Sequence, residues 1–191
     1  VLDDGSVKCF GSNSYRACGQ PTDSTNTGFG NEPGEMGDDL PSVDLGEGRT
    51  AVQICANVAY SCVIDDLGGL RCWGNHPGRG DLMYAPDSVN VGSDTGAVVQ
   101  IACGGTNAYH MCAVFADGRV KCWGSNGSGQ LGLGNTNERG LGYSWNMGDG
   151  LPYVDLGTGR TALQVTAGDI HSCALLDNLQ VKCWGNAAYG Q

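Results

Sequence analysis

Residues 110–134 read HMCAVFADGRVKCWGSNGSGQLGLG: an apolar stretch, a tight turn, a second apolar stretch and a glycine-rich loop. The central string VKCWG, or a near copy, occurs at residues 7–11, 70–74, 120–124 and 181–185, and the cysteines of successive copies lie 63, 50 and 61 residues apart. Periods of this length are typical of propellers and solenoids, in which each repeat is one supersecondary unit. The sequence therefore predicts a repeat protein.

Each full period also carries strand-like segments ahead of this string. Tyr-Ser-Cys, His-Met-Cys or His-Ser-Cys stands shortly before it, a pattern such as AVQI lies further upstream, and a longer segment begins MGDDLP at Met36 and MGDGLP at Met147. These segments are rich in Val and aromatic residues, are bounded by Gly, Asp and Asn, and lack a helical period. Four short strands in each period predict an all-β fold, a β-propeller of four-stranded antiparallel blades.

The run at residues 110–134 resembles the repeat of the regulator-of-chromosome-condensation family, and the resemblance covers nearly the whole chain. It implies a propeller that typically has seven blades, of which 191 residues supply about three. The chain starts and stops inside a repeat, so we expect one partial propeller of a larger ring. The expected divisions are the end of a first blade with a long loop (1–50), a second blade (51–97), a third with a long loop (98–160) and the start of a fourth (161–191).

Six of the ten cysteines form pairs with one spacing of ten residues. A turn lies midway between the members of each pair, so they face each other across a hairpin, with Cα atoms about 4.5 Å apart if the pair is non-hydrogen-bonded. That distance is within reach of a disulfide. Buried free thiols and zinc ligation are the alternatives, although the close Cys-x-x-Cys pairs of zinc sites are absent. The predicted disulfides are Cys62–Cys72, Cys112–Cys122 and Cys173–Cys183.

The other four cysteines are less defined. A partner for Cys9 at the same spacing would lie before the first residue, and Cys18 has no evident partner. Cys55 and Cys103 end equivalent segments of consecutive blades, so a bridge between them is a further hypothesis.

One of the three hairpin turns departs from the others. Two of them place Gly68 and Gly118 where a left-handed residue is needed, but Leu179 stands at that place in the third. Leu adopts this conformation poorly, so we expect the third turn to be built differently.

Charge, hydropathy and cysteine content limit the kinds of partner and the cellular compartment that we expect. The formal net charge is −10, with ten Lys and Arg residues in all, so the chain lacks the basic surface that binds nucleic acid. No apolar run approaches the roughly 18 residues of a membrane span. Disulfides would place the protein in an oxidising compartment, outside the cell or at its surface. Asn126-Gly127-Ser128 is a glycosylation sequon that fits this setting.

Aromatic residues recur at one place in the repeat, which predicts burial in the core between blades. They are Phe10, Trp73, Trp123 and Trp184. Trp145 lies outside the repeat pattern and is the first candidate for an exposed contact.

Signs of catalysis are missing from the sequence. His110 and His171 share a repeat position that Tyr60 occupies in another copy, which favours a structural role. The chain has no phosphate-binding loop, GxSxG motif or HExxH motif. We therefore expect no enzymatic activity, no cofactor and no metal site.

These observations favour an extracellular structural or protein-interaction scaffold, whose rigid blades present variable loops to other proteins or to a cell-surface polymer. Assembly with further copies is compatible with this role. A secreted enzyme inhibitor and a carbohydrate-binding module of a wall or coat are the alternatives. The resemblance also implies a nucleotide-exchange factor for a small GTPase, which the acidic charge disfavours.

Overall fold

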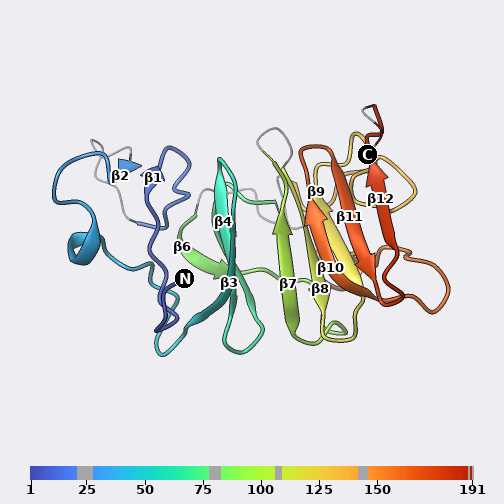
Figure 1. Ribbon diagram of the computed structural model, residues 1–191, viewed down its shortest axis with the longest axis horizontal. Coiled ribbons are helices and arrows are strands. Elements are labelled where there is room, and N and C mark those ends of the chain that lie inside the picture. Colours follow the sequence, from blue (N-terminus) through green and yellow to red (C-terminus); the bar gives the residue numbers. More distant parts are fainter. Residues whose placement is uncertain (21–27, 78–82, 106–108, 142–145, 189, 191) are drawn as a thin grey trace. The chain divides into compact units, whose positions relative to one another are not determined.

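The computed structural model describes residues 1–20, 28–77, 83–105, 109–141, 146–188 and 190. Within these ranges the chain is all-β, with antiparallel sheets and two single-turn 3-10 helices, η1 (Gly37–Asp39) and η2 (Gly148–Gly150) (Figure 1). The chain divides into two compact units, one of Val1–His76 and Asp81–Val89, the other of Pro77–Gly80 and Asn90–Gln191. The predicted fold class is confirmed.

The first unit contains one four-stranded blade and a short hairpin. Each strand of the blade pairs with the next strand along the chain, so the sheet is an antiparallel meander. Its strands are β3 (Ala51–Ala56), β4 (Tyr60–Asp65), β5 (Leu70–Gly74) and β6 (Met83–Ser88). The hairpin consists of β1 (Gly11–Ser12) and β2 (Gly28–Phe29).

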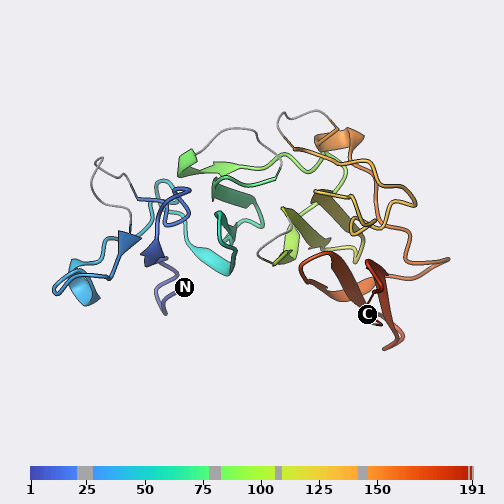
Figure 2. The same cartoon turned by 90° about the horizontal axis from the view of Figure 1, so that it is seen from above.

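The second unit contains two three-stranded sheets of the same topology. One has β7 (Val98–Cys103), β8 (His110–Phe115) and β9 (Val120–Gly124), and the other β10 (Ala162–Ala167), β11 (His171–Leu176) and β12 (Val181–Gly185). Figure 2 shows the two sheets beside each other from above, and β10 contacts both β7 and β8.

The first strand of each blade carries a register shift beside a glutamine. In β7 the shift lies between Val98 and Gln100. The Gln100 side chain pairs with the backbone of Val165 on β10: its Oε1 accepts the Val165 N–H at 2.7 Å, and its Nε2 donates to the Val165 carbonyl at 2.9 Å. The Gln100 amide thus joins β7 to β10 of the next blade by two hydrogen bonds.

The apolar core lies between successive repeats. In the second unit Val114, Val120 and Leu131 pack with Val154, from the connection after β9, and with Val165 and Leu176, from the following repeat. In the first unit Val7 packs in the same way with Val43, Leu45 and Ala51. The connection after the strand and the repeat that follows therefore bury Val7 and Val120 of the VKCWG strands together, as stacking of repeats requires.

The glycine after Trp in each copy is needed for close backbone approach. Gly124 has φ 111°, and a Cβ atom there would overlap the carbonyl oxygen of Tyr109. Gly185 has φ 110° and the same relation to Ile170. Only glycine fits such a site without strain.

The turn at Leu179 is built like the others, so the prediction that it differs is wrong. Leu179 has φ 64°, close to 75° at Gly68 and 79° at Gly118, and its N–H donates to the Leu176 carbonyl as the glycines donate at their own turns. The hairpin strands on either side hold Leu in a conformation that costs it about 1–2 kcal/mol.

Replacing Leu179 by Gly should therefore stabilise the protein. Because the Leu179 side chain is exposed, little burial is lost, and the relief of strain outweighs the added entropy of the unfolded chain by about 0.5–1 kcal/mol. The equally exposed Leu67, which has no positive φ, is the matched control. Urea denaturation checks both variants. A Leu179→Gly protein no more stable than the parent would show that the turn carries no strain.

Candidate interaction surface

A backbone carbonyl of the preceding repeat anchors each tryptophan of the VKCWG strands. Trp73 Nε1 donates to the Ala17 carbonyl at 2.8 Å, and Trp184 Nε1 donates to the Gln130 carbonyl at 2.9 Å. Trp123 does the same with the Pro77 carbonyl at 3.0 Å. Trp73 and Trp123 are fully buried and Trp184 is half-buried. The indoles therefore serve the joints between repeats.

The serine one residue before the hairpin cysteine shares the same acceptor. Ser61 Oγ donates to the Ala17 carbonyl at 2.8 Å, and Ser172 Oγ donates to the Gln130 carbonyl at 3.0 Å. One carbonyl thus accepts a hydroxyl and an indole together, using both of its lone pairs. In the third copy Met111 stands at this place, so only Trp123 donates.

Phe10 lies at the tryptophan position of the first copy, but the prediction that it belongs to the blade core is wrong. Its side chain is 66% exposed. In the other copies, the loop that buries the tryptophan belongs to the repeat before it. Phe also lacks the N–H that the carbonyl would accept. Phe10 therefore presents an aromatic ring to solvent.

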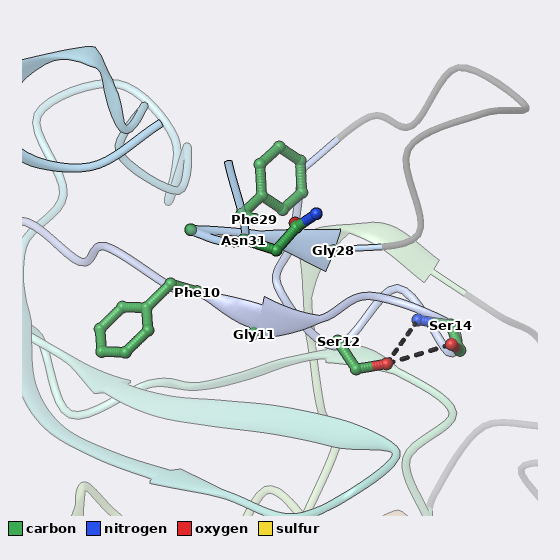
Figure 3. A pocket seen from close by; sticks show the side chains of 8 residues that line it. Phe10, Gly11, Ser12, Ser14, Gly28, Phe29 and Asn31 are labelled. Atoms are coloured by element: carbon green, nitrogen blue, oxygen red, sulfur yellow. Dashed lines mark hydrogen bonds between the residues drawn. The ribbon is translucent and has the colours of Figure 1, made fainter. Parts of the chain in front are cut away.

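Exposed Phe10 borders a hollow at the β1–β2 hairpin (Figure 3). The hollow measures about 360 Å³ and is lined by Phe10, Gly11, Ser12, Ser14, Gly28, Phe29, Gly30 and Asn31. Gly11 pairs with Phe29, so alternation along the strands directs the Phe10 and Phe29 rings to different sides of the hairpin, as Figure 3 shows. Ser12 Oγ and Ser14 Oγ lie 3.0 Å apart and form a hydrogen bond.

This site was missed from the sequence because the aromatic residue of the VKCWG string was assumed to be buried in every copy. The signal was present: the first copy has Phe where the other three have Trp. A Phe cannot make the indole hydrogen bond that anchors the other three rings.

His110 is buried and supports the neighbouring blade. Its Nε2 lies 3.0 Å from Ser172 Oγ. Because that hydroxyl donates to the Gln130 carbonyl, Nε2 carries the proton and donates to Oγ. Burial lowers the pKa of His110 to about 4; repulsion from His171 adds to this effect, and Asp169 opposes it. The arrangement leaves Ser172 without a base, so the pair is structural.

Stability should fall as the pH falls from about 6.5 to about 4. In this window the unfolded chain protonates His110, whose ordinary pKa is 6.5, while the folded chain keeps it neutral. The difference amounts to about 3 kcal/mol. Urea denaturation at pH 7 and pH 4 measures it, and His110→Gln should remove that part of the pH dependence. An unchanged pH dependence in the variant would assign it to other groups.

Disulfides join the cysteines of all three hairpins. Cys62–Cys72, Cys112–Cys122 and Cys173–Cys183 have Cα–Cα distances of 4.1, 4.1 and 4.0 Å. The cysteines of each pair face each other across neighbouring strands, as their spacing predicts.

The remaining cysteines differ in state. Cys9 and Cys18 are free thiols. Burial, with a smaller contribution from Cys18, raises the pKa of Cys9 to about 11, so its thiol is a poor nucleophile at neutral pH. Cys55 and Cys103 are disulfide-bonded, and a bridge between these two stays a prediction.

The predicted glycan at Asn126 is incompatible with the fold. Asn126 is 0% exposed. Its Nδ2 donates to the carbonyls of Asn135 and Asn137, both at 2.9 Å, and its Oδ1 accepts the Leu131 N–H at 3.0 Å. A sugar on Nδ2 would replace one of its two hydrogens and so remove at least one of the bonds to Asn135 and Asn137. Asn126 is therefore a turn-forming residue. Trp145, the other candidate contact, lies outside the described residues.

Two negative findings concern the described ranges alone. No helix there is long and apolar enough to cross a membrane. No three His, Cys, Asp or Glu side chains of those ranges gather into a metal site.

Repeated antiparallel sheets, each with the same tryptophan bond and two of them with the serine bond, define a β-propeller repeat protein. Two models of the regulator of chromosome condensation (RCC1) repeat match the chain, one at residues 98–130 and 163–191 and the other at residues 117–175. The chain belongs to the RCC1 repeat family.

Curated relatives share the repeat but are much longer. The chain is 28% identical over 133 residues to the RCC1 domain-containing protein RUG3, mitochondrial, of Arabidopsis thaliana, covering 67% of this chain and 27% of that protein. It is 30% identical over 158 residues to the probable E3 ubiquitin-protein ligase HERC6 of Homo sapiens, covering 83% of this chain and 14% of the ligase.

Solved structures share the fold at low identity. Yeast RCC1 (Prp20), bound to Kap60, matches with a TM-score of 0.72 and 20% identity over 97% of this chain and 40% of its own. Human WBSCR16 matches with a TM-score of 0.68 and 19% identity over 92% and 41%. The chain therefore spans less than half of each relative named here.

Proposed function

We propose that the chain is a non-enzymatic protein-interaction scaffold that works outside the cell or at its surface. The observation that supports this proposal best is that the repeated side chains and the unrepeated ones have different environments. The repeated Trp, Ser and Gln groups bond neighbouring repeats, whereas Phe10 and the β1–β2 hairpin face solvent around a hollow. Exposed aromatic side chains beside polar groups are common in protein interfaces.

The relatives and the charge support a protein as the partner. Yeast RCC1 is bound to Kap60 in one solved structure, and the crystal structure of Prp20p from Saccharomyces cerevisiae is described with its binding properties to Gsp1p and histones. This chain has a net charge of −10, which favours a basic partner surface. The hairpin disulfides support an oxidising compartment.

A photo-crosslinking amino acid at position 10 tests the proposal. The protein is incubated with extracellular extract from its source. Position 67, which is also exposed but lies in a tight turn of the same unit, is the control. We expect one protein to be captured at position 10 and not at position 67. In purified form that protein should bind the chain, and Phe10→Ser should weaken binding at least about tenfold. Equal capture at both positions, or unchanged affinity, would refute the proposed surface.

Carbohydrate binding is the second candidate, because the hollow combines an exposed aromatic ring with the Ser12 and Ser14 hydroxyls and the Asn31 amide. An aromatic face with hydroxyl and amide partners suits a sugar ring. A glycan array probed with the parent chain and with Phe10→Ala distinguishes this function. Binding that the variant loses would favour the sugar, and an empty array would leave the protein partner.

A further inference from the structure

The β7–β9 sheet and the β10–β12 sheet meet along a joint inside the second unit (Figure 2). Each sheet is fastened internally by its own hairpin disulfide, Cys112–Cys122 in one and Cys173–Cys183 in the other. Neither of these two bridges crosses the joint, where hydrogen bonds and apolar contacts hold the sheets together. The two sheets are therefore stapled bodies with a non-covalent contact between them.

One network of hydrogen bonds across this joint contains a histidine. His110 Nε2 on β8 lies 3.0 Å from Ser172 Oγ on β11. The same hydroxyl donates to the Gln130 carbonyl at 3.0 Å, and Trp184 Nε1 on β12 donates to that carbonyl at 2.9 Å. Of these four side chains only the imidazole of His110 is ionisable.

Burial keeps the His110 ring neutral. His110 and Ser172 are both 0% exposed, so a second proton on the ring would place a full charge between the two sheets, away from water. Repulsion from His171 on β11 acts in the same direction as burial. A hydrogen bond with the His171 backbone and the charge of Asp169, in the turn before β11, act in the opposite direction. Burial outweighs them, and the pKa of His110 falls to about 4.

The comparable bonds of the first unit are made by neutral groups. Ser61 and Trp73 both donate to the Ala17 carbonyl there. Tyr60 stands at the repeat position of His110, and a phenol keeps its proton at acidic and neutral pH. A response to mild acid should therefore begin in the second unit.

We propose that His110 is an acid-sensitive latch: when its ring takes up a proton, the β10–β12 sheet separates from the β7–β9 sheet while both hairpins keep their strands and disulfides. Separation brings the charged ring into water. It also uncovers the apolar side chains packed between the sheets, among them Val114 and Val165. The inference does not rest on the proposed function, because none of these residues belongs to the β1–β2 hairpin.

Separation becomes easier as the pH falls from about 6.5 to about 4. The pKa of His110 is about 4 in the closed joint and returns to its ordinary 6.5 where the ring reaches water. In this window the open joint binds the proton and the closed joint does not. Between pH 7 and pH 4.5 the ratio of open to closed joints should rise about 50-fold. The pKa of Asp65 lies below 3.8, so that carboxylate is still ionised at pH 4.5.

Hydrogen exchange of the full chain at pH 7 and pH 4.5, read by mass spectrometry and corrected for the intrinsic effect of pH on exchange, tests the latch. The Val165 N–H, which bonds Gln100 across the joint, should lose protection about 50-fold. The amides of β4 in the first unit should keep theirs. Unchanged protection at Val165, or an equal loss in β4, would overturn the proposal, because an equal loss means that the whole chain unfolds.

Two variants assign the effect to His110. His110→Gln keeps a side-chain N–H that can donate to Ser172 Oγ but takes up no proton in this range, so protection at Val165 should be the same at both pH values. The matched control, His171→Gln, leaves His110 buried and should keep most of the pH effect. Circular dichroism at pH 7 should show both variants folded. If His110→Gln fails to fold, His110→Tyr, which has the residue of the second blade, replaces it. A full pH effect in the variant without His110 would overturn the latch.

Discussion

Replacing Trp73 by Ala should destabilise the protein by about 3–5 kcal/mol, the range for a fully buried aromatic residue. The substitution removes the indole and leaves a cavity beside the loop at residues 17–19. It also removes the N–H that donates to the Ala17 carbonyl. Ser61 would remain as a donor to that carbonyl, so most of the loss comes from packing. Denaturant unfolding followed by tryptophan fluorescence measures the change.

Phe10→Ala is the matched control, because Phe10 occupies the same place in the repeat. Its ring is exposed, so the change in stability should stay within about 0.5 kcal/mol. A large loss at Phe10, or a small one at Trp73, would contradict the assignment of the repeated aromatic position to the joints between repeats.

Replacing Asp65 by Ala should also destabilise the protein strongly, by about 3–5 kcal/mol. Asp65 is 2% exposed and binds the guanidinium groups of Arg49 at 2.5 Å and Arg71 at 3.0 Å. It also accepts the N–H groups of Leu67 and Gly69. The variant would leave two cations and two turn amides without their shared acceptor. Urea denaturation measures the loss.

The neighbouring Asp66 provides the control for Asp65. Its carboxylate lies 3.4 Å from Arg49 and is partly exposed, so Asp66→Ala should cost about 1 kcal/mol or less. If both variants lost the same free energy of unfolding, the burial of Asp65 would add nothing to the stability of the protein.

The same contacts set the pH response of Asp65. Burial alone would raise the pKa of Asp65, but the hydrogen bonds from Arg49, Arg71, Gly69 and Leu67 outweigh it and hold the pKa below its ordinary 3.8. The stabilisation by this carboxylate is therefore present above about pH 4 and is lost as the pH falls further.

Periodicity made the fold predictable, because four copies of one strand and three copies of a ten-residue cysteine spacing constrain the architecture more than any single segment does. The hairpin disulfides could be predicted because alternation along the paired strands places the two cysteines opposite each other. Phe10 and Asn126 could not be assigned in the same way. Their environments depend on what packs beside them, a preceding loop for the aromatic ring and the carbonyls of Asn135 and Asn137 for the amide.

Leu179 illustrates a different limit. Leu rarely adopts a positive φ, so the sequence predicted a different turn. The strand pairing on both sides nevertheless fixes the backbone and holds Leu179 in the left-handed region. Tertiary contacts of this kind override the preference of one residue.

Disulfide mapping of the native protein tests most directly the proposal that this disulfide-bonded propeller works in an oxidising compartment. Thiols are alkylated with one reagent before reduction and a second afterwards, and peptides are analysed by mass spectrometry. Cys62–Cys72, Cys112–Cys122 and Cys173–Cys183 should appear as linked pairs, while Cys9 and Cys18 take the first reagent once the chain is unfolded. The first reagent on all six hairpin cysteines would contradict the account and place the protein in a reducing compartment.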